Sequence, residues 1–598
     1  MHKINISQFI EHKRQIRLKK YEKKISKKYN GENVNNDINV NNDINVNNDM
    51  NVNNNSENQL VNDNKFINDN KFINDNKFIN DNKFINEVNG NKIYNIIPLN
   101  LFQTWYTLDL PSKMRENVEL LKSQNPEFKY YLYDDQMCEK LIKDNFDEEI
   151  IYTLDKLKPG AYKADLWRYC ILYLKGGIYL DIKYTCFNNF KLIELTDKEY
   201  FVQDRDTGNI IIKSGIYQAL LCCLPNNNIL LECIKQIVYY VKHNLYLDNP
   251  LCITGPHLFL KFRNFKNIKN LELKFSDCSN YIEKNNNKIL KIYDEYRSEQ
   301  KTHQKNKYYE ILWNERNVYN YPLLKYKSKI DFTKEINNSS NINILELNNN
   351  QYLIINLYNN NLSIYSSLII DEELNIINDI KVHNFNNLEK FNKSQLIDIK
   401  LFNHINNIYY IATYINNNVK SFSSGLFYIN NYLNLIPINN TFNNSLLSHF
   451  IYNNDLYVVC GWYPLQIGKI DYETNKLNII KILYNTTEYF KDVEYSTNGY
   501  TYNNEIWFIL NQKQKYKYEN KYNSQHFFAV FDFKMNLSRY SELFKFIHTT
   551  IDDKNYNVEL CSGLIIKNNE IILSYDKSIV LTYDLDYIKT GIKWYKYL

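Results

Sequence analysis

The stretch KPGAYKADLWRYCILYLKGGIYLDIKY, residues 158–184, decides the fold that we expect for the first half of the chain. A Pro-Gly pair marks its start, and the apolar residues that follow recur at helical spacing, which predicts a buried helix. The pair Gly176-Gly177 allows the positive φ with which a chain leaves a helix. The alternating residues after it predict a strand that ends at Asp181. Because ligands of open α/β sheets bind at the carboxyl ends of strands, Asp181 is a candidate site residue.

Three polar side chains of the predicted helix also indicate a site. Asp165, Arg168 and Tyr169 stand at positions i, i+3 and i+4, so a carboxylate, a guanidinium and a phenol share one face. The same helix carries two apolar stripes and is therefore expected to pack into the core. A charge in such a place costs stability unless it is paired or binds a ligand. We therefore expect these three residues to belong to a binding site.

The spacing of these residues resembles that of a known family. The pattern AD-x-x-RY at 164–169, followed by LY-x-x-GGIY-x-D at 172–181, is similar to the core of the DXD-type sugar transferases of glycosyltransferase family 32, which includes α-1,6-mannosyltransferases. The resemblance implies a Rossmann-like α/β domain of the GT-A type. It implies transfer of a sugar from a nucleotide-sugar donor to a glycan or protein acceptor, with a retaining outcome. Our hypothesis is that Asp165 and Arg168 bind hydroxyls of the donor sugar and that Asp181 holds ribose or sugar.

One departure from the family pattern concerns the metal. Where the family has Asp-x-Asp, this chain has Asp181, Ile182 and Lys183. In the family the second acid ligates Mn²⁺ or Mg²⁺ directly, which a protonated lysine cannot do. Two outcomes are open: Lys183 neutralises the donor diphosphate in a metal-independent enzyme, or the site is inactive. We favour metal independence because the other charged residues of the site are present, and Asp181 stays the one candidate metal ligand.

Other segments match the family in their order along the chain. The end of the family's opening strand, where the base and ribose of the donor lie, is matched by Gln103-Thr104-Trp105, although Phe102 replaces the usual histidine. A T-G-P loop resembles the family's acceptor side, but a single histidine after such a loop is more often structural than catalytic. The resemblance thus implies donor-binding roles for Gln103, Thr104, Trp105, Tyr169, Gly176, Gly177, Gln218 and Trp313, and acceptor-side roles for Gly255 and His257.

The segments around these motifs predict a nucleotide-binding α/β unit. Residues 94–105 and 128–135 form two apolar runs that predict strands, and 111–124 between them predicts a helix. The second strand ends on acidic residues. Asp135 also fits a simple N-cap for the helix that begins at Gln136.

Composition indicates which broad class of protein this is, but says little about the reaction that it catalyses. A chain of 598 residues is expected to hold at least two domains. The abundance of Asn, Ile, Lys and Tyr indicates an AT-rich genome, such as that of a large DNA virus or a protist. A net charge of +5 does not indicate nucleic-acid binding. Ten cysteines without a C-x-x-C pair favour free thiols in a reducing compartment. With no apolar run long enough to span a membrane, we expect a cytoplasmic location, in a host cytoplasm or a virion if the chain is viral.

The first 91 residues are expected to lie outside the folded domains. Residues 1–30 are basic and predict an amphipathic helix or a solvated tail, with weak peripheral contact to an anionic membrane as the alternative. Residues 31–91 consist mainly of Asn-rich six-residue repeats, which predict a disordered linker. The transferase domain is expected at 92–330.

Residues 331–598 are expected to be all β. Short aromatic and β-branched runs alternate with Asn-rich turns about every ten residues, which favours a five-bladed β-propeller over a sandwich. Asp398 and Glu559 lie in runs that weakly resemble blade motifs of sugar-processing propellers, and they are candidates for a carboxylate pair. The alternative is that both residues only anchor turns or bind glycan.

Three functions therefore remain open. The first is a nucleotide-sugar-dependent hexosyltransferase. The second is a transferase that has lost activity and acts as a glycan-binding protein through its propeller. The third is a propeller with its own glycoside-processing activity.

Overall fold

The chain forms two compact units, Met1–Tyr309 and Glu310–Leu598. The computed structural model describes residues 85–88, 91–94, 96–205, 215–262, 271–276, 280–303, 307–332, 339–347, 351–358, 364–378, 381–384, 395–404, 407–416, 419–427, 436–437, 447–471, 476–546, 560–575 and 579–597. The predictions for residues 1–30 and for most of 31–91 therefore lie outside the described residues.

A nine-stranded mixed sheet forms the centre of the first unit, in the order β4-β3-β5-β8-β7-β9-β10-β11-β6. Its β3 pairs in parallel with both β4 and β5, whereas β5 and β8 are antiparallel. The strands are β3 (Asn100–Thr104), β4 (Lys129–Tyr133), β5 (Gly177–Leu180), β6 (Tyr184–Cys186), β7 (Tyr200–Gln203), β8 (Ile216–Cys223), β9 (Leu273–Phe275), β10 (Tyr281–Lys284) and β11 (Asn287–Ile292).

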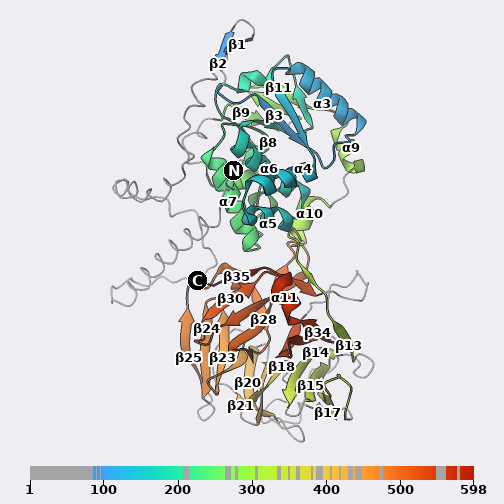
Figure 1. The fold of residues 1–598 in the computed structure, drawn as a ribbon, viewed down its shortest axis with the longest axis vertical. Helices are drawn as coiled ribbons and strands as arrows, with labels where there is room; N and C mark the ends of the chain where they lie inside the picture. Colours follow the sequence, from blue (N-terminus) through green and yellow to red (C-terminus); the bar gives the residue numbers. More distant parts are fainter. Residues whose placement is uncertain are drawn as a thin grey trace, which may run out of the picture. The chain divides into compact units, whose positions relative to one another are not determined.

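Helices pack against this sheet (Figure 1): α6 contacts β5 and β8, and α3 contacts β6. Helices α4, α5 and α7 gather around α6, so its apolar stripes are covered. The helices are α3 (Ser112–Gln124), α4 (Asp135–Asn145), α5 (Glu148–Lys156), α6 (Gly160–Lys175), α7 (Asn228–Lys242), α8 (Pro256–Leu260) and α9 (Tyr296–His303), with 3₁₀ turns η3 (Leu192–Leu195) and η4 (Pro250–Cys252).

The helix, turn and strand predicted from residues 158–184 are confirmed by α6 and β5. Gly176 and Gly177 have φ values of 61° and 122°, a backbone region that favours glycine. A Cβ on Gly177 would lie 2.6 Å from the carbonyl oxygen of Asn100 on β3, so the turn also lets two strands approach closely. Asp181 follows β5 directly, at the carboxyl end of a strand that is parallel to its neighbour β3.

Some predicted boundaries in the first unit differ from the structure. The first predicted strand, 94–105, is represented by β3 alone, because Pro98 lacks the N–H that a ladder requires. The N-cap of α4 is Asp134, whose side chain accepts a hydrogen bond from the backbone N–H of Met137, so the prediction that Asp135 caps this helix is wrong. Strands β1 (Ile85–Val88) and β2 (Asn91–Tyr94) form a two-stranded sheet, although Ile85–Val88 lies within the segment predicted to be disordered.

The second unit is rich in β-strands and holds four four-stranded antiparallel sheets. Strand β14 contacts β32 and β18, and β18 contacts β22, so these sheets follow one another in a propeller-like ring. They consist of β13 (Ser328–Asp331) with β32 (Cys561–Lys567), β33 (Glu570–Tyr575) and β34 (Ile579–Asp584); β14 (Ser339–Leu347), β15 (Gln351–Tyr358), β16 (Ile364–Ile370) and β17 (Lys381–Asn384); β18 (Gln395–His404), β19 (Asn407–Asn416), β20 (Val419–Phe427) and β21 (Ile436–Pro437); and β22 (Ser448–Tyr452), β23 (Asp455–Trp462), β24 (Leu465–Asp471) and β25 (Lys476–Leu483).

The prediction of five four-stranded blades is not supported. The remaining large sheet has six strands, because it takes in both the short β27 and the late strand β35. Its strands are β26 (Val493–Ser496), β27 (Tyr500–Tyr502), β28 (Glu505–Lys515), β29 (Tyr522–Phe531), β30 (Leu537–Ser541) and β35 (Trp594–Lys596). Helix α11 (Leu585–Gly591) precedes the last strand, and η8 (Glu488–Phe490) precedes the first.

The division between the units lies earlier than the boundary predicted between residues 330 and 331. Strand β12 (Leu323–Leu324) pairs with β31 (Lys545–Phe546), and β13 pairs with β34, so the chain has joined the second unit before residue 331. Helix α10 (Tyr309–Asn314) begins at the last residue of the first unit.

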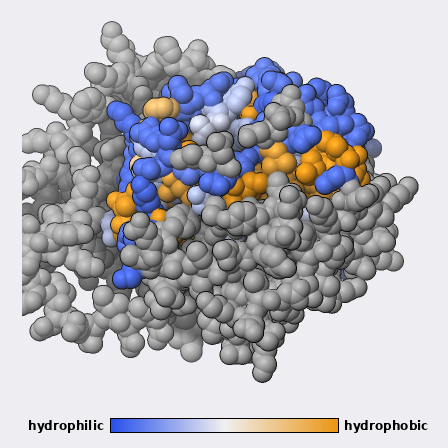
Figure 2. All heavy atoms as spheres, turned by 90° about the horizontal axis from the view of Figure 1, so that it is seen from below, coloured by the Kyte–Doolittle hydropathy of each residue, from blue (hydrophilic) through white to orange (hydrophobic). Residues whose placement is uncertain are grey.

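The coloured residues in Figure 2 are largely hydrophilic, with a band of apolar side chains among them. Exposed apolar residues are normal on folded proteins, so this band by itself indicates no ligand. Among the described residues, no helix has the length and apolar character needed to cross a membrane.

Candidate functional site

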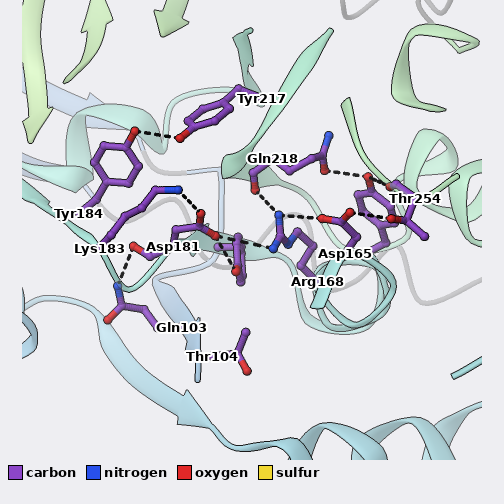
Figure 3. Close-up of polar contacts among 12 residues, drawn as sticks. Gln103, Thr104, Asp165, Arg168, Asp181, Lys183, Tyr184, Tyr217, Gln218 and Thr254 are labelled. Carbon is purple, nitrogen blue, oxygen red and sulfur yellow. Dashed lines mark hydrogen bonds and ion pairs between the residues drawn. The ribbon is translucent and has the colours of Figure 1, made fainter. Parts of the chain in front are cut away.

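Arg168 lies at the centre of a buried polar cluster that joins α6 to the ends of β5 and β8 (Figure 3). Its Nη1 lies 3.0 Å from Asp165 Oδ1 and donates to the carbonyl oxygen of Gln218 at 2.8 Å. Its Nη2 lies 3.6 Å from Asp181 Oδ1. The guanidinium stacks over the ring of Tyr179, with its Cζ 4.4 Å from the ring centroid. Within the described part of the chain, its Nε–H has no hydrogen-bond acceptor.

A second group of contacts ties the Asp165 side of the cluster to the T-G-P loop. The Thr254 hydroxyl donates to Asp165 Oδ2 at 2.7 Å. The Tyr169 hydroxyl lies 2.8 Å from the Thr254 carbonyl oxygen and 2.7 Å from Gln218 Oε1. Gln218 itself donates to the carbonyl oxygen of Ile216. Gln218 and Tyr169 are therefore occupied in positioning one another, and both are buried.

The other side of the cluster is the pair of Asp181 and Lys183. Lys183 Nζ donates to Asp181 Oδ2 at 2.7 Å, and the Tyr179 hydroxyl donates to Asp181 Oδ1 at 2.9 Å. Asp181 keeps 23% of its side chain exposed, against 12% for Asp165 and 8% for Arg168. Asp181 is thus the member of the cluster most open to a ligand.

Three aromatic rings surround the Lys183 ammonium. Its Nζ lies 5.5 Å from the ring centroid of Tyr184, 5.4 Å from that of Tyr217 and 6.0 Å from that of Tyr296. Such distances allow cation–π attraction. The hydroxyls of Tyr184 and Tyr217 lie 3.1 Å apart, which fixes two of these rings together. The rings therefore hold a cation in a partly desolvated place.

The pairing of Asp181 with Lys183 determines the protonation of both side chains. Burial alone would raise the pKa of Asp181, but Lys183 and Arg168 together lower that pKa below its ordinary value. Burial alone would lower the pKa of Lys183, but the Asp181 carboxylate holds it above its ordinary value. Both groups are therefore charged at neutral pH. For Asp165, burial raises the pKa of the carboxyl, while Arg168 and Thr254 act in the opposite direction.

The three residues predicted at the end of the opening strand lie at different distances from this cluster. Gln103 is fully buried; its Nε2 donates to the backbone oxygen of Asp181 at 3.4 Å, and its Oε1 accepts from the Tyr130 hydroxyl. Thr104 donates to the carbonyl oxygen of Tyr133. Trp105 packs against the core beneath the sheet, and among the described residues its Nε1–H has no acceptor. Only Gln103 of these three touches the cluster directly.

The structure brings Gly255 next to the cluster and gives His257 a separate partner. A Cβ on Gly255 would lie 3.5 Å from Asp165 Oδ2, so the loop passes close to this carboxylate. His257 Nδ1 lies 3.1 Å from Asn249 Oδ1, and burial lowers the pKa of the imidazole. Gly176 and Gly177 act through the backbone turn and not through a ligand contact in this structure.

Three predicted residues lie in the second unit. Trp313 is buried there, with Arg316 Cζ 4.4 Å from its ring centroid. Asp398 is buried as well and accepts a hydrogen bond from the Tyr495 hydroxyl at 2.9 Å. Glu559 lies outside the described residues, so the predicted carboxylate pair with Asp398 stays a prediction.

Asp181, the candidate metal ligand, already accepts hydrogen bonds from two protein groups. Asp181 uses both oxygens on protein donors, and the place of a second acid is taken by the Lys183 ammonium. Among the described residues, no group of three or more His, Cys, Asp or Glu side chains is arranged to hold a metal ion. A metal bound at Asp181 Oδ2 would compete with the Lys183 ammonium for that oxygen.

Sequence reasoning missed several contacts of the site. Thr254 begins the T-G-P loop at residues 254–256, but its hydrogen bond to Asp165 follows only from the fold. Tyr179 could have been found, because it alternates with Asp181 on the strand and faces the same side. Tyr217 and Tyr296 carry no local signal, since they come from β8 and α9.

Comparison with known proteins points to sugar transfer for this part of the chain. Residues 111–202 match the family model of the glycosyltransferase sugar-binding region containing the DXD motif. An uncharacterized glycosyltransferase of Acanthamoeba polyphaga mimivirus is 36% identical over 96 residues, which cover 16% of this chain and 38% of that protein. A mannosyl phosphorylinositol ceramide synthase of Saccharomyces cerevisiae is 28% identical over 148 residues, or 25% of this chain and 36% of that protein.

These matches are partial. The chain spans less than half the length of either relative. The solved structure of the PaToxG glycosyltransferase covers 28% of this chain and 69% of its own, at 17% identity and a TM-score of 0.22, which is too low to carry an argument.

Proposed function

We propose that the first unit transfers a hexose from a nucleotide-sugar donor to a glycan or glycoprotein acceptor. The observation that carries this proposal is the Asp165–Arg168–Asp181–Lys183 cluster at the carboxyl end of β5, within the region that matches a glycosyltransferase sugar-binding model. Because one relative is named a glycosyltransferase and another a mannosyl phosphorylinositol ceramide synthase, a mannosyl donor is the first to test.

Lys183 is the group we assign to the donor diphosphate. An ammonium has three N–H donors, and among the described residues Lys183 gives a hydrogen bond only to Asp181. Two N–H donors therefore remain for phosphate oxygens. A fixed cation of this kind stabilises the charge that develops on a departing leaving group, which is commonly the largest electrostatic contribution in such reactions.

Asp165 and Arg168 are assigned to the donor sugar, and Asp181 to ribose or sugar hydroxyls. The partly exposed Asp181 carboxylate has acceptor capacity beyond the two donors that it already binds. Arg168 holds the carboxylates of Asp165 and Asp181 in place. We expect a retaining outcome and metal independence, since a buried lysine occupies the position of the second acid.

Turnover of nucleotide sugars by the full chain tests the proposal. Hydrolysis of GDP-mannose, UDP-glucose, UDP-galactose and UDP-N-acetylglucosamine is measured with and without EDTA, alongside Asp165→Asn as the matched inactive control. We expect turnover of at least one donor that EDTA leaves unchanged. Complete loss on chelation would refute the role of Lys183, and no turnover of any donor would favour a transferase that has lost activity.

A further inference from the structure

The backbone turn that carries Lys183 is held in place by other parts of the first unit. The turn comprises residues 181–184, between the end of β5 and the start of β6, and we call it the lysine turn. Within it, the N–H of Tyr184 donates to the Asp181 carbonyl oxygen at 3.0 Å. A four-residue turn has at most this one hydrogen bond of its own. The exact position of Lys183 therefore depends on contacts between the turn and neighbouring elements.

The side chain of Asn117 on α3 contacts the lysine turn on both sides of Lys183. Its Nδ2 donates to the carbonyl oxygen of Ile182 at 3.0 Å and to that of Tyr184 at 3.2 Å. Because carbonyl oxygens only accept hydrogen bonds, the amide nitrogen and not the amide oxygen of Asn117 must face them. Asn117 is 5% exposed, so both hydrogen bonds are shielded from water. One buried amide thus ties the residues before and after Lys183 to the helix.

The carbonyl oxygen of Lys183 itself is held from another direction. It accepts from the backbone N–H of Tyr293, which follows β11, at 3.1 Å. Each of the three carbonyl oxygens at 182–184 therefore has a donor from outside the turn, and Asn117 supplies two of them. A buried carbonyl that loses its donor is costly. Without Asn117 the lysine turn is expected to shift until its freed carbonyls find water or another donor.

Helix α3 is also fixed to the aromatic wall around the Lys183 ammonium. The carboxylate of Glu299 on α9 accepts from the backbone N–H groups of Lys113 and Met114, in the first turn of α3, at 2.9 and 3.0 Å. Tyr296 of α9 is one of the three rings around Lys183. The same helix thus holds the backbone of the lysine turn and one wall of the place that its side chain occupies.

The place of the ammonium is narrow, so a small shift of the lysine turn matters. Lys183 Nζ lies 2.7 Å from Asp181 Oδ2 and 5.4 Å from the ring centroid of Tyr217, and its side chain is 11% exposed. A misplacement of about 1 Å in an active site costs ~10²-fold in rate. A change that lets the turn relax is therefore expected to slow a reaction that needs this cation.

We propose that Asn117 is a positioning residue, which holds the lysine turn so that the Lys183 ammonium faces the donor diphosphate. Its effect on catalysis rests on the function proposed above for Lys183. Its effect on the placement of Lys183 does not, and can be measured without any donor. Asn117 is buried and acts only through the backbone of the turn.

The same helix offers a matched control. Asn125, which follows the last residue of α3, is 2% exposed. Its Nδ2 donates to the Leu121 carbonyl oxygen at 2.9 Å, and its Oδ1 accepts from the Leu192 N–H at 2.8 Å. In the described part of the chain, none of its hydrogen bonds reaches residues 181–184. Asn125→Ala therefore removes a buried asparagine from α3 without freeing the lysine turn.

Chemical labelling of the full chain tests the placement of Lys183. Wild type, Asn117→Ala and Asn125→Ala are treated with acetic anhydride, and acetylation of Lys183 is followed over time by peptide mass spectrometry. In the wild type we expect slow labelling, because the ammonium is paired with Asp181 and largely buried. Labelling becomes faster in Asn117→Ala and stays at the wild-type rate in Asn125→Ala.

Donor hydrolysis by the same variants tests the effect on catalysis. Asn117→Ala should lower the rate by about 10–100-fold, up to the cost of a 1 Å misplacement, whereas Asn125→Ala keeps the wild-type rate. Added to Lys183→Met, Asn117→Ala should cause no further loss, because the group that it positions is already gone. Melting curves report the stability that each variant loses. Should Asn117→Ala fail to fold, Asn117→Gln keeps the amide but moves it by one methylene, and the same measurements apply.

Three outcomes separate this proposal from the function on which it rests. Equal labelling of Lys183 in Asn117→Ala and the wild type would show that the turn keeps its position without Asn117, and would overturn the proposal. A rate loss of equal size with and without Lys183 would also overturn it, because Asn117 would then act through another group. Faster labelling of Asn117→Ala in a chain that hydrolyses no donor would refute the transferase and support the placement of Lys183 by Asn117.

Discussion

Replacing Lys183 by methionine tests whether the charge of this side chain takes part in catalysis or only stabilises the fold. The substitution keeps an unbranched side chain of similar length among the rings of Tyr184, Tyr217 and Tyr296 but removes the charge. Lys183→Arg keeps the charge and serves as the matched control. Both variants are compared with the wild type for donor hydrolysis in the presence of EDTA.

The expected size of the effect follows from the contacts of the site. Arg168 cannot take over the task of Lys183, because its two Nη groups already face Asp165, Asp181 and the Gln218 carbonyl oxygen. Removing one preorganised donor to a developing oxyanion costs about 2.7–4 kcal/mol. We therefore expect donor hydrolysis by Lys183→Met to fall by roughly 10²–10³-fold. Lys183→Arg should stay within about tenfold of the wild type.

The pH dependence gives a second readout that a structural role would not produce. In the wild type, Lys183 and Arg168 hold the pKa of Asp181 below its ordinary value, against the effect of burial. The ionised carboxylate, and the stability that its pairing contributes, are therefore present above the unfolded pKa and lost only as pH falls through the depressed folded value. Without Lys183 that pKa rises, so the acid limb of the pH–rate profile moves to higher pH.

The prediction fails under two results. Lys183→Met with donor hydrolysis within twofold of the wild type would show that the cation takes no part in catalysis. A large rate loss without any movement of the acid limb would contradict the coupling between Lys183 and Asp181. A melting curve for each variant excludes unfolding as the cause, since Asp181 retains the Tyr179 hydroxyl at 2.9 Å and Arg168 at 3.6 Å.

Two further substitutions test how the fold holds this site. Gly177→Ala should lower the stability of the first unit by more than about 1 kcal/mol, because φ is 122° and the new Cβ would lie 2.6 Å from the Asn100 oxygen. Gly160→Ala, where a Cβ meets nothing within 4 Å, is the control in the same thermal melt, and equal melting temperatures would contradict the argument. Thr254→Val should destabilise the unit by about 1.5–3 kcal/mol and slow donor turnover, because buried Asp165 loses a 2.7 Å hydrogen bond. Thr254→Ser should restore both values, and a Val variant as stable and active as the wild type would show that the hydroxyl is dispensable.

The sequence predicted the part of the site that depends on local geometry. The helical spacing of Asp165 and Arg168 placed both on one face, and the alternation after Gly177 placed Asp181 at a strand end; the structure brings all three together. These relations arise from the repeats of one helix and one strand, so no knowledge of the tertiary fold is needed.

What depends on distant contacts could not be predicted in this way. Trp313, for which the resemblance implied a donor-binding role, lies in the second unit beside Arg316. The blade count failed for a related reason: strand runs can be recognised from alternation, but whether β27 and β35 join an existing sheet depends on pairing partners far along the chain.

Replacing the family's second acid by Lys183 changes the chemistry of the position but leaves the net charge that faces the donor diphosphate unchanged. In the DXD family an aspartate and its divalent metal together present one net positive charge to the diphosphate. Lys183 presents the same net charge without a metal, and Asp181 and the surrounding tyrosines hold it in place. A substitution that leaves the charge facing the donor unchanged is compatible with a working site. A neutral residue at this position would remove that charge altogether, so the lysine itself, more than the surviving acids, favours an active enzyme over one that has lost activity.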